Sequence, residues 1–464
     1  MGIRLRMTIS GILLAAALLV TATAAAEPLL HISPATTFYF YQERDLFGNT
    51  LDRSRGIMDL NMGLLGREDA LDYEIYIYLR VRGEFGQDLT EAAKLADQGR
   101  VQFDLMLAQL SLPRIYNALD VTLGRQLVSD ECGQNLVDGG SLSFWRNWYV
   151  GARFVAGAVV RNTDNRTLGA YDYSLPNFNP FALEGPLPDE GPDQGALLGV
   201  SLFTTNLPST YAQVSWRRTY SGWDLEDDRL AAMVRQDFLD RALSLHAGAE
   251  GNFYTMEWQR VEFGAAGRYA GVELAASYGY ELPLFPAYSI FVVFPYVAHK
   301  DFGLSVSVTT WPQLTGSLDY HRRFYDDSAL FPTAFSPEGQ FADELDARLT
   351  WRPEGLPLEL MVWATGSMGY GGQFASLNGR LRAWFLEDRL TLTAMASGQH
   401  YRQVTMYDQL APGAVYGFGG GGVLGASWRF IREVLASASI EYNGNPVTAR
   451  DLRVLLSLAV EAQP

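Results

Sequence analysis

The sequence predicts an all-β protein, a transmembrane antiparallel up-and-down β-barrel of about 22 strands, within a range of about 18 to 22. Three observations predict this fold: an N-terminal export signal, a recurring alternation of apolar and polar residues, and connections that alternate between short and long. After the export signal, no apolar run approaches the roughly 18 residues of a membrane-spanning helix. Strands are therefore expected to cross the membrane.

The export signal has the three parts of a secretory signal peptide. Arg4 and Arg6 give a positive n-region, Ile9 to Val20 an apolar h-region, and Ala24 to Ala26 a cleavage site of small residues. The apolar run is about a dozen residues long, short of the roughly 20 that a membrane anchor requires. We therefore expect residues 1–26 to be removed as a signal peptide.

The remaining residues, 27–464, are expected to form one outer-membrane barrel. A chain of this length would ordinarily suggest about two or three soluble domains, but no linker or shift in composition divides it. No plug domain fits between residue 27 and the first expected strand. Cys132 is the only cysteine and lies far from the cleavage site, so we expect neither a lipoprotein nor an internal disulfide. Its thiol is expected to be isolated and without function.

The chain is acidic, with 52 Asp and Glu residues against 36 Lys and Arg residues and a formal net charge of −16. Removal of the signal peptide takes away two arginines and no acid, which lowers the charge to −18. Binding of nucleic acid requires a basic face, so this balance argues against it. Aromatic residues make up 13% of the chain and glycines number 45, which suits the strands, interfacial girdles and tight turns of a barrel.

The clearest expected strand is Leu71–Arg82, in which odd positions are apolar or aromatic and even positions are charged or tyrosine. Successive side chains of a strand point to opposite faces, so one wall of this strand suits lipid and the other suits water. Runs of about 9 to 13 residues with this pattern, the length that a tilted strand needs to cross a bilayer, recur from end to end. The expected strands span 35–44, 55–65, 71–83, 99–111, 117–127, 139–146, 149–161, 195–205, 209–220, 228–237, 241–252, 257–269, 271–282, 302–312, 314–326, 343–353, 357–368, 374–386, 389–402, 421–431, 433–443 and 449–461.

The connections between these strands alternate in length. Short turns are expected at 66–70, 146–148, 238–240, 270–271, 312–313, 352–355, 386–388 and 431–433, and long loops at 84–98, 162–194, 283–301, 327–342 and 403–420. Short periplasmic turns and long outer loops are typical of outer-membrane barrels, and the pattern places both termini on the periplasmic side. The expected location is the outer membrane of a Gram-negative cell.

Arginine supplies almost all of the positive charge, since Lys94 and Lys300 are the only lysines. Many arginines and several acids fall on the expected water-facing wall: Arg80, Arg82, Arg217, Arg268, Arg323, Arg348, Arg380, Arg382, Arg429 and Arg453, with Glu74, Asp319 and Asp346. Because a guanidinium binds carboxylate or phosphate in a bidentate manner, one interpretation is a pore-lining ladder that attracts anionic solutes. The other is a set of wall-to-wall ion pairs that keeps the lumen hydrated, and it is favoured because inward acids are almost as common.

Catalytic and metal sites have little support in the sequence. Asp319 and His321 lie two positions apart on one strand face, about 7 Å, within reach of one another or of a substrate. Five histidines are scattered along the chain and suit lumen or interface positions better, so we expect no enzyme. No loop has an ordered Asp-x-Asp-x-Asp calcium pattern, and we expect no cofactor and no metal.

The segment Leu284–Tyr296 is unusually apolar for an outer loop. An exposed apolar patch of that size marks an interaction site. A constriction or lid inside the lumen is the favoured interpretation. Contact with a partner and an additional strand pair remain as alternatives.

Val121–Gln126 reads Val-Thr-Leu-Gly-Arg-Gln, and residues 136–140 read Leu-Val-Asp-Gly-Gly. In these segments the chain resembles bacterial outer-membrane porins of the alginate-export and substrate-specific type, in which a strand ending in Gly-Arg-Gln precedes an Asp-Gly turn. The resemblance implies a monomeric barrel that passes a particular solute or polymer, often through an arginine-lined lumen, and it makes Arg125 a further candidate pore-lining residue. The C-terminal residues Glu461 to Pro464 depart from the terminal aromatic residue of many outer-membrane barrels.

The expected function is an outer-membrane channel or porin for the passive passage of small hydrophilic solutes, with an anionic preference if the arginine ladder dominates. The alternative is a barrel that encloses a periplasmic or surface partner protein as a sleeve, or that conducts a polymer in a multi-protein envelope assembly. Outer-membrane lipid and lipopolysaccharide are the expected surroundings. Stable conductance of the isolated barrel separates channel from sleeve, and a hydrolase assay tests the disfavoured enzyme.

Overall fold

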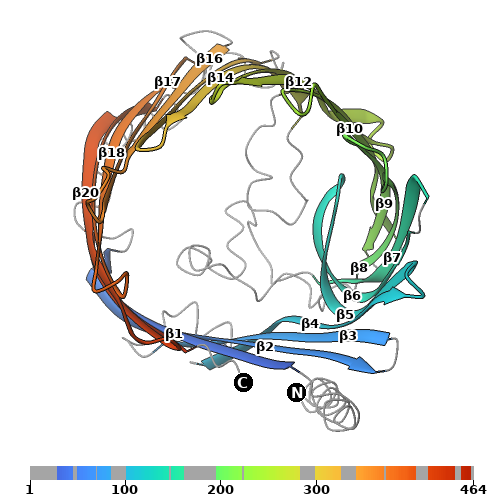
Figure 1. Cartoon of the computed structure of the whole chain (residues 1–464), viewed down its shortest axis with the longest axis horizontal. Helices are drawn as coiled ribbons and strands as arrows, with labels where there is room; N and C mark the ends of the chain where they lie inside the picture. Colours follow the sequence, from blue (N-terminus) through green and yellow to red (C-terminus); the bar gives the residue numbers. More distant parts are fainter. Residues whose placement is uncertain are drawn as a thin grey trace, which may run out of the picture.

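The computed structural model describes residues 29–44, 50–68, 71–84, 101–145, 148–160, 195–221, 224–282, 298–325, 341–369, 372–403, 416–444 and 451–460. These residues form one antiparallel sheet of 22 strands, in which strands adjacent in sequence pair with one another. β1 (Leu29–Arg44) also pairs with β22 (Asp451–Val460), so the sheet closes on itself. Figure 1 shows the resulting ring. The predicted 22-stranded antiparallel barrel is confirmed.

The strands between these two follow one another around the ring. They are β2 (Thr50–Glu68), β3 (Leu71–Glu84), β4 (Val101–Ile115), β5 (Leu119–Asp130), β6 (Gly133–Phe144), β7 (Val150–Val159), β8 (Gly195–Thr204), β9 (Thr210–Ser221), β10 (Asp224–Phe238), β11 (Leu243–Asn252), β12 (Glu257–Tyr269), β13 (Val272–Glu281), β14 (His299–Trp311), β15 (Leu314–Tyr325), β16 (Phe341–Trp351), β17 (Leu358–Gly369), β18 (Gly372–Phe385), β19 (Leu390–Gln403), β20 (Tyr416–Ile431) and β21 (Val434–Gly444). Each coincides with one predicted strand. One difference matters for the site: the prediction ended a strand at 127 and began the next at 139, whereas β5 and β6 continue to Asp130 and Gly133.

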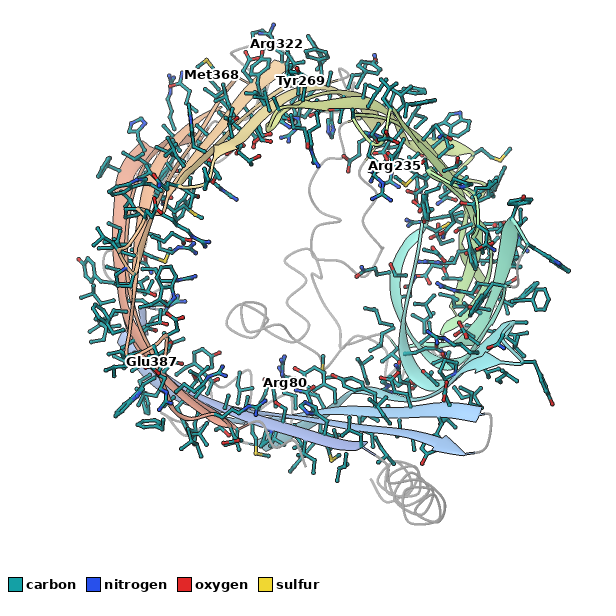
Figure 2. All side chains as sticks on the ribbon, in the orientation of Figure 1. Arg80, Arg235, Tyr269, Arg322, Met368 and Glu387 are labelled. Carbon is teal, nitrogen blue, oxygen red and sulfur yellow. The ribbon has the colours of Figure 1, made fainter. Side chains whose placement is uncertain are left out.

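Apolar and polar side chains alternate between the two faces of the wall. On β13, Leu274 and Tyr278 are on the outer face and are 60% and 48% exposed, toward the membrane. Figure 2 shows Arg322 and Met368 outside the ring and Arg80 inside it. Among the residues that the structure describes, no helix is long and apolar enough to cross a membrane.

Aromatic side chains mark the two ends of the outer face. On β16, Phe341 and Trp351 stand at the extracellular and periplasmic ends, and both are exposed. Ten residues at a rise of about 3.3 Å and a tilt of about 40° span roughly 25 Å along the barrel axis. That height equals the apolar band of an outer-membrane barrel, so the two side chains lie at the two membrane interfaces.

Two sequence expectations lie outside the described residues. They are the signal peptide at 1–26 and the apolar segment Leu284–Tyr296, which was expected to narrow the lumen. A different segment, on β5 and β6, lies inside the barrel.

Candidate functional site

The hairpin of β5 and β6 leaves the barrel wall partway along its length. β5 pairs with β4 only from Leu119 to Arg125, and β6 pairs with β7 only from Val137 to Phe144. The two strands stay paired with one another as far as their turn. Figure 1 shows this hairpin curving into the ring beside β7, β8 and β9. We call residues 126–137 the inward hairpin.

Three glycines in adjacent strands lie at the bend. Gly124 on β5 is opposite Gly139 on β6, which is opposite Gly157 on β7. Gly124 has a φ of +107°, a conformation that glycine adopts without steric cost. A Cβ at Gly124 would lie 2.2 Å from the carbonyl oxygen of Ala108, and one at Gly139 would lie 2.1 Å from that of Ala156. These glycines therefore allow the backbones to approach closely enough for the bend.

An apolar cluster holds the inward hairpin against the wall. Val128 and Val137 of the hairpin pack with Val155 on β7 and Leu197 on β8, and none of the four is more than 6% exposed. Folding the hairpin inward removes these side chains from the water of the lumen, which stabilises the fold by about 1.5 to 3 kcal/mol for each fully buried side chain. Alternate residues point the other way, so Leu127, which is 55% exposed, faces the open lumen.

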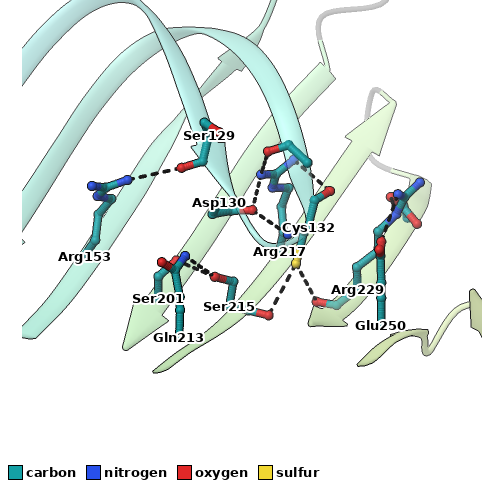
Figure 3. A network of polar contacts seen from close by, with 12 residues as sticks. Ser129, Asp130, Cys132, Arg153, Ser201, Gln213, Ser215, Arg217, Arg229 and Glu250 are labelled. Atoms are coloured by element: carbon teal, nitrogen blue, oxygen red, sulfur yellow. Dashed lines mark hydrogen bonds and ion pairs between the residues drawn. The ribbon is translucent and has the colours of Figure 1, made fainter. Parts of the chain in front are cut away.

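Polar contacts fasten the tip of the hairpin to β9, as Figure 3 shows. Arg217 forms an ion pair with Asp130, and both side chains are 4% exposed. The same guanidinium donates hydrogen bonds to the carbonyl oxygens of Gly133, at 2.8 Å, and Cys132, at 3.4 Å. The buried Cys132 thiol donates to the carbonyl oxygen of Ser215, with an Sγ···O distance of 3.3 Å. Arg217, expected on the open water-facing wall, is thus covered by the hairpin and anchors it.

The segments that carry the porin resemblance form the bend itself. Arg125 and Asp138 are paired across the hairpin, with Nε···Oδ1 and Nη2···Oδ2 distances of 2.7 Å each. The Arg125 guanidinium also donates to the carbonyl oxygen of Leu105, at 2.7 Å, on the part of β4 that has lost its pairing with β5. Ser141 donates to Oε1 of Gln126 at 2.9 Å. Arg125 therefore ties the hairpin to the freed edge of β4.

Several of the arginines expected to line the pore are held in ion pairs. Arg80 pairs with Asp59, and Arg82 with Asp104, each at 2.7 Å. Further pairs join Arg268 to Glu273, Arg323 to Asp301 and Glu344, and Arg380 to Glu359. These contacts favour the wall-to-wall interpretation for this group of arginines.

Three other expected pore-lining arginines form no ion pair within the part of the chain that the structure describes. They are Arg348 on β16, Arg382 on β18 and Arg429 on β20. Each lies within the last four residues of its strand, at the periplasmic end. Their strands, β16, β18 and β20, lie in one sector of the ring, away from the inward hairpin, in Figure 1.

Two of the three acids expected to line the pore occupy neighbouring strands. Asp319 on β15 is directly opposite Asp346 on β16, and the hydroxyl of Thr365 donates a hydrogen bond to Asp346. Glu74 on β3 is opposite Ser111 on β4. Cross-strand repulsion between Asp319 and Asp346 is eased by the hydroxyl donor.

The sequence predicts that Asp319 and His321 lie on the same face of one strand. In the structure the two side chains do not bind one another. His321 Nδ1 lies 2.9 Å from Oδ1 of Asp301 on β14, and Arg323 binds the other oxygen of the same carboxylate. The carboxylate lies between His321 and Arg323 and is part of the ion-paired wall. Across the described strands and turns, no group of three or more His, Cys, Asp and Glu side chains is arranged to hold a metal ion.

Comparisons with known proteins bear on the fold. No protein-family model matches this chain, and no curated protein matches it. Among solved structures, a variant of the ferric enterobactin receptor PfeA from Pseudomonas aeruginosa has a TM-score of 0.57 and 11% identity, over 93% of this chain and 80% of that one. The fold is that of an outer-membrane barrel.

Two further solved structures cover almost the whole chain. OccAB2 of Acinetobacter baumannii has a TM-score of 0.45 and 8% identity, over 94% of this chain and 98% of that one. OpdK of Pseudomonas aeruginosa, solved with vanillate, has a TM-score of 0.43 and 8% identity, over 95% and 100%. At these identities a likeness describes the fold alone, and the resemblance to alginate-export porins stays a prediction.

Sequence reasoning missed the contacts that hold the inward hairpin. Residues 128–138 were expected to be a loop, and Cys132 an isolated thiol, whereas the thiol is buried under the hairpin tip. The available signal was apolar pairs at both ends of that segment, Leu127-Val128 and Leu136-Val137, together with the glycines beside them. Nothing in the local pattern points to Leu197 or Arg217, because their contacts with the hairpin join residues far apart in the chain.

Proposed function

We propose that this protein is an outer-membrane channel for the passive passage of small hydrophilic solutes, narrowed by the inward hairpin. The observation that carries the proposal is a closed barrel with a hairpin docked inside it by a buried cluster and a buried ion pair. Charged and hydrogen-bonded side chains on the inner wall, such as Arg80 with Asp59, suit a water-filled lumen. Passage requires no energy input, since a solute descends its own gradient.

The hairpin supports selectivity because a barrel of this size would otherwise be wide. Barrels of about 22 strands are large enough to enclose a plug. Here the lumen is narrowed by part of the wall itself, which presents Leu127, Arg125 and Asp138 toward the remaining space. A solute would pass between this surface and the opposite wall, so its size and charge would set its rate.

An anionic preference belongs to the same proposal. Arg348, Arg382 and Arg429 add positive charge to the inner wall at its periplasmic end, and none of them forms an ion pair within the described residues. A guanidinium binds carboxylates and phosphates through two parallel hydrogen bonds. The three arginines would therefore raise the local concentration of anionic solutes although the whole chain is acidic.

Single-channel conductance of the purified barrel, with the reversal potential in a salt gradient, tests the proposal. We expect stable openings with anion preference. The variant Arg348→Gln/Arg382→Gln/Arg429→Gln should shift the reversal potential toward cation selectivity, because it removes three positive charges from the wall. Its matched control, Arg241→Gln/Arg389→Gln/Arg432→Gln, removes the same charge from periplasmic turns and should shift it less.

The outcomes are distinct. Cation preference in the unaltered barrel would overturn the anionic part of the proposal and leave the channel. Silence from a barrel shown to be folded would overturn the channel itself and favour the alternative, a sleeve for a partner protein or an exported polymer.

A further inference from the structure

The charged side chains that we find on the lipid-facing surface of the described strands lie near their extracellular ends. They are Arg218 on β9, Asp228 on β10, Lys300 on β14, Arg322 on β15, Asp343 on β16 and Arg402 on β19. Four are cations and two are acids, so the described part of this surface carries a net positive charge although the chain as a whole has a net charge of −16. Charge on the lipid face of a barrel is costly at mid-membrane and nearly neutral at the interface.

Asp343 is at the centre of one group of contacting side chains on this surface. Its carboxylate accepts hydrogen bonds from Nε and Nη2 of Arg322, at 2.8 and 2.9 Å, and from the Tyr320 hydroxyl, at 2.6 Å. The guanidinium carbon lies 4.9 Å from the centre of the Phe341 ring and 5.9 Å from that of Phe324. The Asp343 carboxylate and the two phenylalanine rings therefore fix one edge of the Arg322 guanidinium. The Arg322 side chain is still 40% exposed, which leaves the other edge toward the membrane surface.

Lys300 places a second cation beside this guanidinium. In the register of β14 and β15, Lys300 is opposite Phe324, and Phe302 is opposite Arg322. Lys300 and Arg322 are thus diagonal neighbours on one face, about 7 to 8 Å apart. Two cations at this separation can share one phosphate group or bind two adjacent ones.

The height of the group matches the headgroups of the outer leaflet. Arg322 packs on Phe341, which stands at the extracellular end of the roughly 25 Å apolar band that ends at Trp351. Phosphate groups of outer-leaflet lipids lie at this interface. Below it, toward the periplasm, the outer face carries Leu345 and Leu349, which are exposed and apolar.

An apolar groove runs down the outer face from the same group. Its volume is about 960 Å³, and its lining includes Ala265 on β12, Ala276 on β13, Leu304 on β14 and Leu318 on β15. Tyr320 joins the two features, because its ring lines the groove and its hydroxyl binds Asp343. Small side chains form a depression between larger ones, so the groove has the shape and polarity for an acyl chain.

A second group repeats the same construction on β9 and β10. Asp228 accepts a hydrogen bond from Nε1 of Trp216, at 2.8 Å, and forms an ion pair with Arg218. The Arg218 guanidinium lies 5.3 Å from the centre of the Trp216 ring. In both groups an aromatic donor and a carboxylate hold an arginine flat at the outer interface, which makes the arrangement more than a single surface ion pair.

We propose that Lys300 and Arg322 bind the phosphate groups of an outer-leaflet glycolipid of the lipid A type, and that the groove below them holds one of its acyl chains. The pairing of two cations with an apolar groove favours a phosphorylated lipid over a free anion, which would leave the groove empty. The proposal concerns the outer face and is independent of what crosses the lumen.

Native mass spectrometry of the purified barrel in detergent, titrated with bisphosphorylated lipid A, tests this site. The variant Lys300→Gln/Arg322→Gln should bind about ten-fold more weakly, since it loses charge-assisted hydrogen bonds to phosphate. Asp343→Asn should bind as tightly or more tightly, because it keeps both cations and removes the neighbouring negative charge. Arg389→Gln/Arg432→Gln, which removes two cations from periplasmic turns, should bind like the unaltered protein.

Two further titrations identify the source of the phosphate. Dephosphorylated lipid A should bind the unaltered barrel about ten-fold more weakly, as the double variant does with the phosphorylated lipid. Inorganic phosphate should not displace the lipid. Equal affinity of the double variant and the unaltered barrel for bisphosphorylated lipid A would overturn the proposal, as would equal affinity for the two forms of lipid A. Displacement by inorganic phosphate would reduce the site to a free-anion site.

Discussion

Two ion pairs on the inner wall differ in how far water reaches them. Arg217 and Asp130 are both 4% exposed, whereas Arg80 and Asp59 are 32% and 27% exposed. Removing one partner of a buried pair costs about 3 to 5 kcal/mol, because the other charge remains in a dry site. An exposed pair contributes only about 0 to 1 kcal/mol. Arg217 therefore decides whether the hairpin stays docked, and Arg80 does not.

The substitution Arg217→Gln should release the hairpin tip while the barrel remains closed. Cys132 reports on this directly, since its thiol is buried between the hairpin tip and β9. We expect slow maleimide labelling of Cys132 in the unaltered protein and labelling about 100-fold faster in Arg217→Gln, in line with the loss of about 3 kcal/mol of docking free energy.

Arg80→Gln is the control for this labelling experiment and should leave the rate nearly unchanged. Fast labelling of the unaltered protein, or equal rates in both variants, would show that the ion pair does not hold the tip.

The β5–β6 hairpin belongs to the scale of elements, because its bend depends on three strands at once. Gly124, Gly139 and Gly157 are in register across β5, β6 and β7. The close approach to the carbonyl oxygens of Ala108 and Ala156 leaves no room for a side chain. A hairpin of alternating residues without these glycines would continue along the wall, as its neighbours do.

Gly139→Val should prevent the bend and so remove the constriction. We expect a larger single-channel conductance than in the unaltered barrel, together with faster labelling of Cys132. Gly379→Val on β18 is the matched control, because a Cβ at Gly379 meets no atom within 4 Å. If Gly139→Val folds and conducts like Gly379→Val, the hairpin does not limit passage.

At the scale of the whole molecule, closure depends on the pairing of the first and last strands. β1 and β22 are in register from Ala35–Ala459 to Tyr41–Arg453, which includes the pair Thr37 and Ser457. Directly opposed residues of antiparallel strands have Cα atoms about 4.5 to 5.5 Å apart, within the range of a disulfide. The pairing of β1 with β22 can therefore be tested with an engineered disulfide.

In a Cys132→Ser background, Thr37→Cys/Ser457→Cys should form a disulfide under mild oxidation. The cross-linked barrel should keep its folded migration on a detergent gel at a higher temperature, because the ends cannot separate. Thr37→Cys/Arg453→Cys, four residues out of register, should not cross-link. The opposite result would mean that the strands pair in another register.

The sequence by itself determined the barrel. Alternation such as that of Leu71–Arg82 is local, since each residue's face follows from its neighbours, and so all 22 strands could be placed without tertiary contacts. The prediction that the Gly-Arg-Gln segment ends a strand and that Asp-Gly forms a turn was wrong, because both segments lie within the paired strands β5 and β6, at the bend. Arg348, Arg382 and Arg429, which we propose to line the pore, lie on the face that this alternation assigned to water.

Only the tertiary structure decided which wall residues face open water. The hairpin packs Val128 against Leu197 and Asp130 against Arg217, which are 69 and 87 positions apart in the chain. Whether an inward arginine is exposed or buried depends on what lies across the lumen from it, and periodicity within a strand carries no such information. Likewise, Lys300 and Arg322 become neighbours only through the register of β14 and β15, because strand pairing brings together side chains that are distant in sequence.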